Sequence, residues 1–191
     1  YKIKQMYVSL DLETTGFDHQ KDHIIEFGAV KFNHDGETER LQFFVKSPIP
    51  IPPIVTHITN IRDEDIADAL PFEDHIAEIQ AFIGDFPIIG HNIGFDTGFL
   101  RAKGIEVTGP DYDTHILAGM LLPNLPSYSL EVISQTLGLN HEDKHRALDD
   151  AIAAMELFLE LIKRFESIPS NLLDKIKQLS AKSTWPLNRL V

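Results

Sequence analysis

The sequence predicts an α/β domain built on a mixed sheet that is covered by helices. Its apolar, strand-like segments are grouped near the beginning, whereas later strand-like segments alternate with segments of helical spacing. The 191 residues are 43% hydrophobic, which is enough for one compact core. Grouped strands followed by interleaved helices are typical of a mixed sheet with helices on its faces.

The first third of the chain predicts three strands. Residues 6–12 (MYVSLDL) have the composition of a short buried strand, and residues 23–32 and 37–47 form a hairpin pattern across the turn at 33–36. The proline-rich segment 48–53 cannot continue a central strand or a helix, so we expect an extended connector there.

The rest of the chain alternates between helices and short strands. Helical spacing predicts helices at 62–70 and 72–84, a brief apolar strand follows at 86–92, and a further helix at 94–104 ends at a glycine. The last expected elements are a short strand at 112–115 and helices at about 115–122, 129–137 and 147–165.

Composition excludes several classes of function. The absence of cysteine excludes disulfides, thiolate metal sites and cysteine nucleophiles, and it fits a reducing compartment, so we expect a cytoplasmic protein. No apolar run is long enough to span a membrane, and no secretory signal is present. The net charge of −12 argues against a broad basic surface for nucleic acid, but bound divalent cations would reverse the sign of a local acidic cleft.

Two acids end the first predicted strand. Side chains alternate along a strand, so Asp11 and Glu13 share one face and Leu12 points to the other. Active sites in such sheets collect near the carboxyl ends of strands. Such a pair is usually solvated on an edge strand, but the surrounding apolar run favours burial here. Because two buried carboxylates repel each other, the pattern indicates a hard divalent metal between them.

Further acids and a histidine follow. Asp96 lies at a helix start, where the alternative is an acid that only suits the helix dipole. His145 and Asp150 stand five residues apart, in a segment that taken alone is more typical of a charged helix start than of a functional site. In a continuous helix these two side chains would point about 140° apart, so we expect His145 on a loop. Asp149 fits the helical phase as well as Asp150 does, and His141 is interpreted as a coincidental neighbour.

Three motifs, in order, resemble a known family. The segments DLETTG and HNIGFD, and the spacing His145-x-x-x-x-Asp150, are similar to those of the DEDDh 3′–5′ exonucleases. That family includes the proofreading epsilon subunit of bacterial DNA polymerase III, and exonuclease domains fused to bacterial helicases. The resemblance covers residues 6–165 and implies a ribonuclease-H-like fold. A sister class has tyrosine at the position of Arg146, so the histidine class is indicated.

The resemblance also implies roles for individual residues. It implies two divalent metal ions, Mg²⁺ or Mn²⁺, and a general base. The implied metal ligands are Asp11, Glu13, Asp96 and Asp150, and the implied base is His145. The implied substrate-binding residues are Thr14, Thr15 and Gly16 through their backbone groups, Phe17 and Ile58 on the base or sugar, and Asn92 and Phe95 along the cleft. The alternative for these neighbours is that they are ordinary turn and core residues.

The function that this resemblance implies is metal-dependent 3′–5′ hydrolysis of DNA. We expect release of nucleoside 5′-monophosphates, a preference for single strands, and a role in replication proofreading or repair. One alternative is an exoribonuclease that trims RNA 3′ ends, which recognition of a 2′-hydroxyl would decide. Another is a non-catalytic docking module with a nuclease fold, which would bind metal without cleaving.

The sequence also predicts how the chain is organised. Residues 1–166 are expected to form the exonuclease domain, and residues 167–191 a C-terminal helical extension or a linker to a further domain. The extension carries apolar residues at helical spacing and then the segment TWPL, and it resembles linkers to a helicase or polymerase part. We therefore expect an excised domain with a fused or associated helicase or polymerase. The alternative is a terminal helix that packs on its own domain.

Overall fold

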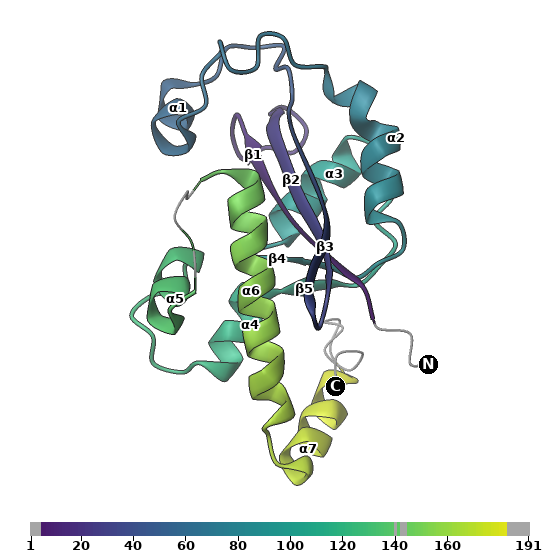
Figure 1. Ribbon diagram of the computed structural model, residues 1–191, viewed down its shortest axis with the longest axis vertical. Coiled ribbons are helices and arrows are strands. Elements are labelled where there is room, and N and C mark those ends of the chain that lie inside the picture. Colours follow the sequence, from purple (N-terminus) through teal and green to yellow (C-terminus); the bar gives the residue numbers. More distant parts are fainter. Residues whose placement is uncertain (1–4, 140, 142–144, 183–191) are drawn as a thin grey trace.

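A mixed five-stranded sheet forms the centre of the protein, in the order β3-β2-β1-β4-β5 (Figure 1). The structure is a computed structural model, and it describes residues 5–139, 141 and 145–182. The strands are β1 (Tyr7–Thr14), β2 (Ile24–Asn33), β3 (Gly36–Phe44), β4 (Ile88–Gly90) and β5 (Asp111–Asp113). The helices are α1 (Pro53–Thr59), α2 (Phe72–Ile83), α3 (Gly94–Ala102), α4 (Thr114–Leu121), α5 (Leu130–Leu137), α6 (Ala147–Glu166) and α7 (Ser170–Ser180).

The strand directions confirm the predicted α/β class. β1 pairs antiparallel with β2, and β2 pairs antiparallel with β3. On its other side β1 pairs parallel with β4, which pairs parallel with β5. The early strands therefore form a meander, whereas the later ones are joined through helices, as their interleaved pattern indicated.

The alternation of side chains along β1 separates the two faces of the sheet. Val8, Leu10 and Leu12 are buried in the cluster that includes side chains of α2 and α3. Tyr7 belongs to the cluster on the α6 side, and the Ser9 hydroxyl donates to the Ala151 carbonyl of α6 at 2.7 Å. Asp11 and Glu13 continue this second series, so they face the beginning of α6. Figure 1 shows α6 along one face of the sheet, with α2 and α3 on the other.

A close backbone approach fixes the beginning of α6. A Cβ atom at Gly28 of β2 would lie 2.2 Å from the Leu148 nitrogen and 2.3 Å from the Ala147 carbonyl carbon. Only glycine leaves room for the helix at this position. Further along, α6 buries Phe158 and Leu161 against the sheet.

The structure corrects the sequence prediction between the hairpin and α2. The expected helix at 62–70 is wrong, because this segment forms turns closed by bonds between residues three apart. Two acidic side chains compete for the backbone: Asp65 accepts from the Arg62 amide at 2.8 Å, and Asp63 accepts from the Ile51 amide at 2.9 Å. The sequence prediction also missed α1, which begins at the second proline of the pair Pro52-Pro53, where a helix tolerates proline.

The C-terminal helix α7 lies against the domain. Leu173 and Ile176 pack on the core cluster that includes residues of α6, whereas Leu172 and Leu179 are exposed. This arrangement is the one expected of a terminal helix that packs on its own domain, and a linker role stays a prediction. The TWPL segment lies outside the described residues, as do residues 1–4. Within the described part of the chain, no helix combines the length and the apolar character that a membrane crossing requires.

Candidate active site

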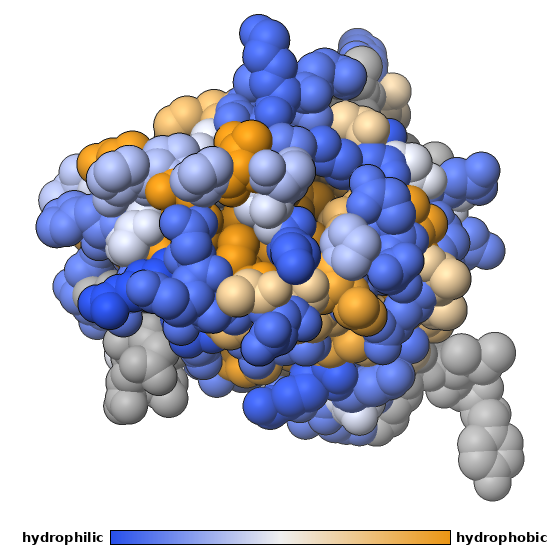
Figure 2. All heavy atoms as spheres, turned by 90° about the horizontal axis from the view of Figure 1, so that it is seen from above, coloured by the Kyte–Doolittle hydropathy of each residue, from blue (hydrophilic) through white to orange (hydrophobic). Residues whose placement is uncertain are grey.

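A cavity of about 480 Å³ opens where β1 ends, and it brings together the five predicted catalytic residues. Asp11 and Glu13 come from β1, Asp96 from α3, Asp150 from α6, and His145 from the turn before α6. Figure 2 views the molecule from this end and shows apolar side chains in a hollow surrounded by hydrophilic ones. Residues far apart in the sequence therefore converge on one acidic space.

Asp96 is held by the strand that carries the other two acids. It lies in the first turn of α3 and is buried, and its Oδ1 accepts from the Leu12 amide at 3.0 Å. Leu12 stands between Asp11 and Glu13 in sequence, so this bond ties α3 to the strand end.

Asp150 is contacted by groups that come from the segment before α6. The His145 amide donates to Asp150 Oδ2 at 3.1 Å, and the His141 ring, through Nε2, contacts Oδ1. His145 has a φ of 62°, a left-handed backbone conformation, and it lies in a turn, as the sequence predicted. His141 was set aside in the sequence analysis, yet the structure places its ring on a predicted metal ligand. Asp149 is only half-buried and does not line the cavity.

The arrangement suits a hard divalent metal. Glu13, His145 and Asp150 each offer a ligand atom, and these atoms lie within 4.8 Å of one another. Asp11 and Asp96 add carboxylates to the same cavity. Carboxylate oxygens are the ligands that Mg²⁺ and Mn²⁺ prefer.

Burial and mutual repulsion raise the pKa values of three acids in this cavity. Burial raises the pKa of Asp11 well above its usual range, and the charges of Asp96 and Asp150 raise it further. Burial also raises the pKa of Glu13 to about 8, with Asp150 as the next cause. The pKa of Asp96 is raised chiefly by burial, although the bond from the Leu12 amide opposes the rise. A divalent cation held among these groups would oppose both causes of the raised pKa values, because it favours the charged form of each carboxylate.

A second, apolar cavity of about 390 Å³ adjoins the acidic one. Phe17 is 89% exposed at its mouth, and its ring meets Phe95 edge-on, with 6.1 Å between the ring centroids. Ile58 and Ile54 line the same cavity from α1 and are largely exposed. Ile54 was not singled out from the sequence. Its spacing of four residues from Ile58 would have revealed it, had a helix been predicted there.

The polar neighbours of the motif shape the entrance. Thr15 is buried, and its amide donates to the His23 carbonyl at 2.8 Å, so this amide already has a partner. The Thr14 hydroxyl donates to the Gly16 carbonyl at 2.7 Å, and a Cβ at Gly16 would meet the Asp22 carboxylate. Thr14, Thr15 and Gly16 all border the apolar cavity.

The opposite rim of the acidic cavity is formed by His91 and Asn92. Asn92 is exposed with a φ of 61°, and its amide donates to Asp113 Oδ1 at 3.0 Å. His91 is fixed through both ring nitrogens, by the Thr114 hydroxyl at 2.9 Å and the Tyr128 carbonyl at 2.8 Å. His91 is the first residue of the HNIGFD motif, but the sequence predicted no role for it.

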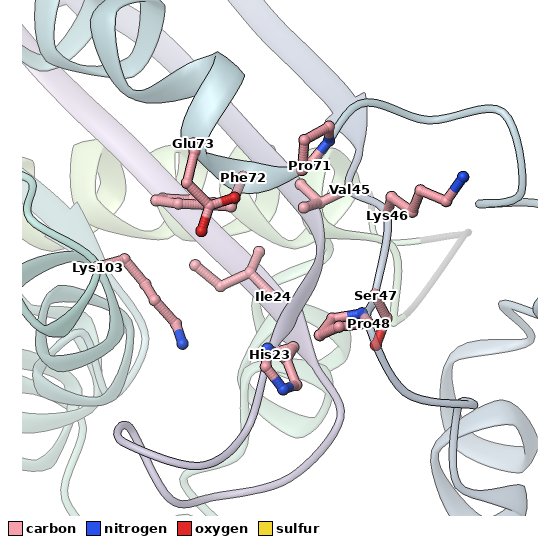
Figure 3. A pocket seen from close by; sticks show the side chains of 10 residues that line it. All are labelled: His23, Ile24, Val45, Lys46, Ser47, Pro48, Pro71, Phe72, Glu73 and Lys103. Atoms are coloured by element: carbon pink, nitrogen blue, oxygen red, sulfur yellow. The ribbon is translucent and has the colours of Figure 1, made fainter.

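A further hollow, of about 310 Å³, lies between the start of β2 and the start of α2 (Figure 3). Figure 3 shows Lys103 and Glu73 extending beside apolar side chains, while the ammonium group of Lys46 points away from them. None of the five predicted catalytic residues lines it. All five of these residues line the cavity at the end of β1 instead.

Comparisons with known proteins agree with this geometry. Residues 8–158 match the RNase T family, which is described as "Exonuclease". The chain is 34% identical over 165 residues to the PolC-type DNA polymerase III of Clostridium perfringens, and this match covers 84% of the chain and 11% of the polymerase. It is 31% identical over 196 residues to the 3′-5′ exonuclease DinG of Bacillus subtilis, covering 98% of the chain and 21% of that protein. The chain thus spans only a small part of these relatives.

Solved structures share the fold. Exonuclease X in complex with 5′ overhanging duplex DNA superposes with a TM-score of 0.69 at 26% identity, covering 83% of this chain and 91% of the other. Escherichia coli exonuclease I in complex with a dT13 oligonucleotide gives a TM-score of 0.74 at 20% identity, covering 90% of this chain and 43% of the other. The second likeness shows the fold alone.

Proposed function

Because the chain belongs to the exonuclease family, we propose that it is a metal-dependent 3′–5′ exonuclease that removes nucleoside 5′-monophosphates from the 3′ end of DNA. The observation that carries the proposal is the convergence of Asp11, Glu13, Asp96, His145 and Asp150 on one cavity. Carboxylates can hold divalent ions and an imidazole can accept a proton, and metal-assisted hydrolysis of a phosphodiester uses both of these functions.

In this proposal the four carboxylates hold two divalent ions, with Mg²⁺ expected and Mn²⁺ as a substitute. When bound, the ions activate a water and stabilise the leaving oxygen. Asp11 and Glu13 supply ligands from a strand, and Asp150 supplies one from a helix, so the set is anchored on rigid elements. Asp96 acts directly or through a water.

His145 is proposed as the general base. Its ring lines the cavity beside Glu13 and Asp150, and the residue is exposed enough to pass a proton to solvent. A base in this role must be neutral near pH 7 and close to the attacking water. The imidazole takes the proton from the water and releases it to the bulk.

The adjoining apolar cavity is proposed to hold the terminal nucleotide. Phe17, Phe95 and Ile58 present apolar surface for a base or sugar, and stacking on aromatic rings accepts any base. The strand must present its 3′ end without a partner strand to enter, so single-stranded or frayed DNA is the proposed substrate. The rims formed by residues 14–16 and by Asn92 are proposed to contact the backbone.

The names of the relatives support DNA as the substrate and replication or repair as the setting. One relative is a DNA polymerase III and another is a 3′-5′ exonuclease, and one structural neighbour was solved with duplex DNA. A fused or associated polymerase or helicase is part of the same proposal. Residues 1–166 are proposed as the exonuclease domain, with 167–191 as its extension.

A digestion series on 5′-labelled oligonucleotides tests the proposal. We expect a ladder that shortens one nucleotide at a time from the 3′ end in magnesium, faster on single-stranded DNA than on duplex DNA or RNA. Chelation with EDTA should stop it. Faster digestion of RNA would make the protein an exoribonuclease. Metal binding without any cleavage would make it a docking module.

A further inference from the structure

A fifth acid lies beside the four predicted metal ligands. Glu26 of β2 stands directly across from Glu13 of β1 in the strand register, and it is fully buried. It contributes to the raised pKa of Asp11 and of Glu13, so its charge reaches the cavity. It does not line the cavity, however, and its oxygens have other partners.

Those partners come from the beginning of α6. The Arg146 guanidinium donates to Glu26 from Nη2 at 2.9 Å and from Nε at 3.2 Å, and the Ala147 amide donates at 3.2 Å. Gln42 of β3 donates a further bond at 2.9 Å, and the Arg146 guanidinium lies over the Phe44 ring at 5.3 Å. A planar guanidinium paired by two bonds with a buried carboxylate is a fixed arrangement, which lysine cannot reproduce.

The pair fixes the residue next to His145. Arg146 is in an extended conformation just before α6, and His145 is in the left-handed conformation. A non-glycine residue keeps that conformation only when its surroundings impose it. The backbone of His145 is held at both ends. Its N–H donates a hydrogen bond to Asp150, and the residue that follows it, Arg146, is paired with Glu26.

The helix that carries Asp150 has other supports. Its first turn packs directly against Gly28, and the Ala151 carbonyl accepts a buried hydrogen bond from the Ser9 hydroxyl. Loss of the Arg146 anchor should therefore leave Asp150 in place and release mainly the turn that holds His145. The effect of the pair is expected on the base rather than on the metal ligands.

We propose that Arg146, held by Glu26, is a positioning residue that sets the orientation of the His145 ring in the cavity. This inference rests on the proposed function, because it assigns Arg146 an effect on the step that His145 performs. A misplacement of about 1 Å in a reacting group can cost about 100-fold in rate. Arg146→Lys is therefore expected to lower kcat by about 10-fold to 100-fold, with KM and the magnesium half-saturation within about twofold.

The test is a double-mutant cycle with Arg146→Lys and His145→Ala, measured on labelled single-stranded DNA. If Arg146 acts through His145, Arg146→Lys should change kcat by less than about twofold once His145 is alanine. The matched control is Arg164→Lys, which alters an exposed arginine–glutamate pair with Glu160 on the same helix, and its kcat should stay at the level of the unaltered protein. Arg146→Gln leaves the charge of Glu26 and its bonds from Gln42 and Ala147 in place, and it provides a second variant if Arg146→Lys does not fold.

The outcomes separate the inference from the proposed function. An equal loss of kcat in both backgrounds would overturn the inference and make the pair a structural support. A folded Arg146→Lys variant with unaltered kcat would overturn it too. Absence of magnesium-dependent cleavage by the unaltered protein would instead refute the proposed function.

Discussion

The two cavities that meet at the end of β1 share residues but differ in chemistry. Leu12, Glu13, Phe17 and Phe95 border both, yet one cavity collects four carboxylates and the other is walled by isoleucines and phenylalanines. The acidic cavity is built on strands and helices, whereas the apolar one opens beside α1, a helix of seven residues. Substitutions of residues that line only one of the two cavities are therefore expected to change kcat and KM separately.

The largest effect is expected from Asp11→Asn in the acidic cavity. Removal of this charge weakens metal binding at the centre of the cluster, so cleavage should fall by more than about 10⁴-fold in magnesium. The fold should remain, because the change also relieves repulsion from Asp96 and Asp150. The measurement is single-turnover cleavage of labelled DNA, with Asp68→Asn on an exposed loop as the control. Near-normal cleavage by the Asp11 variant would show that the site is assigned wrongly.

His145→Ala should come next. Removal of a general base typically lowers kcat by about 10²–10⁴-fold, and we expect KM and metal affinity to be largely kept. A pH–rate profile together with a magnesium titration is the measurement. Recovery of activity at high magnesium would mean that His145 supports metal binding, and unaltered kcat would mean that it only orders the turn. His141→Ala is the matched comparison, because its ring contacts Asp150 without lining the cavity.

Ile58→Ser tests the apolar cavity. Burial of an isoleucine side chain against a ligand is worth about 1.5 kcal/mol or more, so its loss should raise KM about tenfold while kcat changes by less than about twofold. Steady-state kinetics on single-stranded DNA measure both constants. Leu70→Ser is the control, since Leu70 is similarly exposed but borders neither cavity. A fall in kcat as large as the rise in KM would mean that the two cavities are not separable.

The sequence was sufficient to predict where a side chain points when the geometry of a single helix or strand determines its direction. Alternation along a single strand placed Asp11 and Glu13 on the face opposite Leu12, and the angular argument about His145 and Asp150 correctly required a turn. The α/β class followed from the order of strands and helices. The first two conclusions depend on local geometry alone, and the third depends on the order of the elements along the chain.

The sequence was insufficient to predict local structure and side-chain partners that depend on contacts between distant parts of the chain. The segment 62–70 has helical spacing, but the bonds from Asp63 and Asp65 to backbone amides favour turns, and such competition is not visible in a periodicity. The contact of His141 with Asp150 depends on how the segment before α6 folds back. Glu26 carried the same signal as Asp11 and Glu13, an acid within an apolar strand, but only its pairing with Arg146 distinguishes its role.

The smallest expected effect is the dependence of stability on pH in the absence of metal. Glu13 has its pKa raised to about 8 in the folded protein, against 4.5 for the unfolded group, and Asp11 and Asp96 are raised in the same direction. Between these two pKa values the folded state binds more protons than the unfolded chain, so stability falls as the pH rises. In EDTA the melting temperature should therefore drop by about 5 °C or more between pH 5 and pH 8. Magnesium at pH 8 should restore it, because binding to the folded state alone stabilises that state. Glu13→Gln should flatten the profile in EDTA and weaken the response to magnesium, whereas Asp68→Asn should behave like the unaltered protein. A melting temperature that rises from pH 5 to pH 8 in EDTA would contradict the assignment of the acids as a mutually repelling cluster.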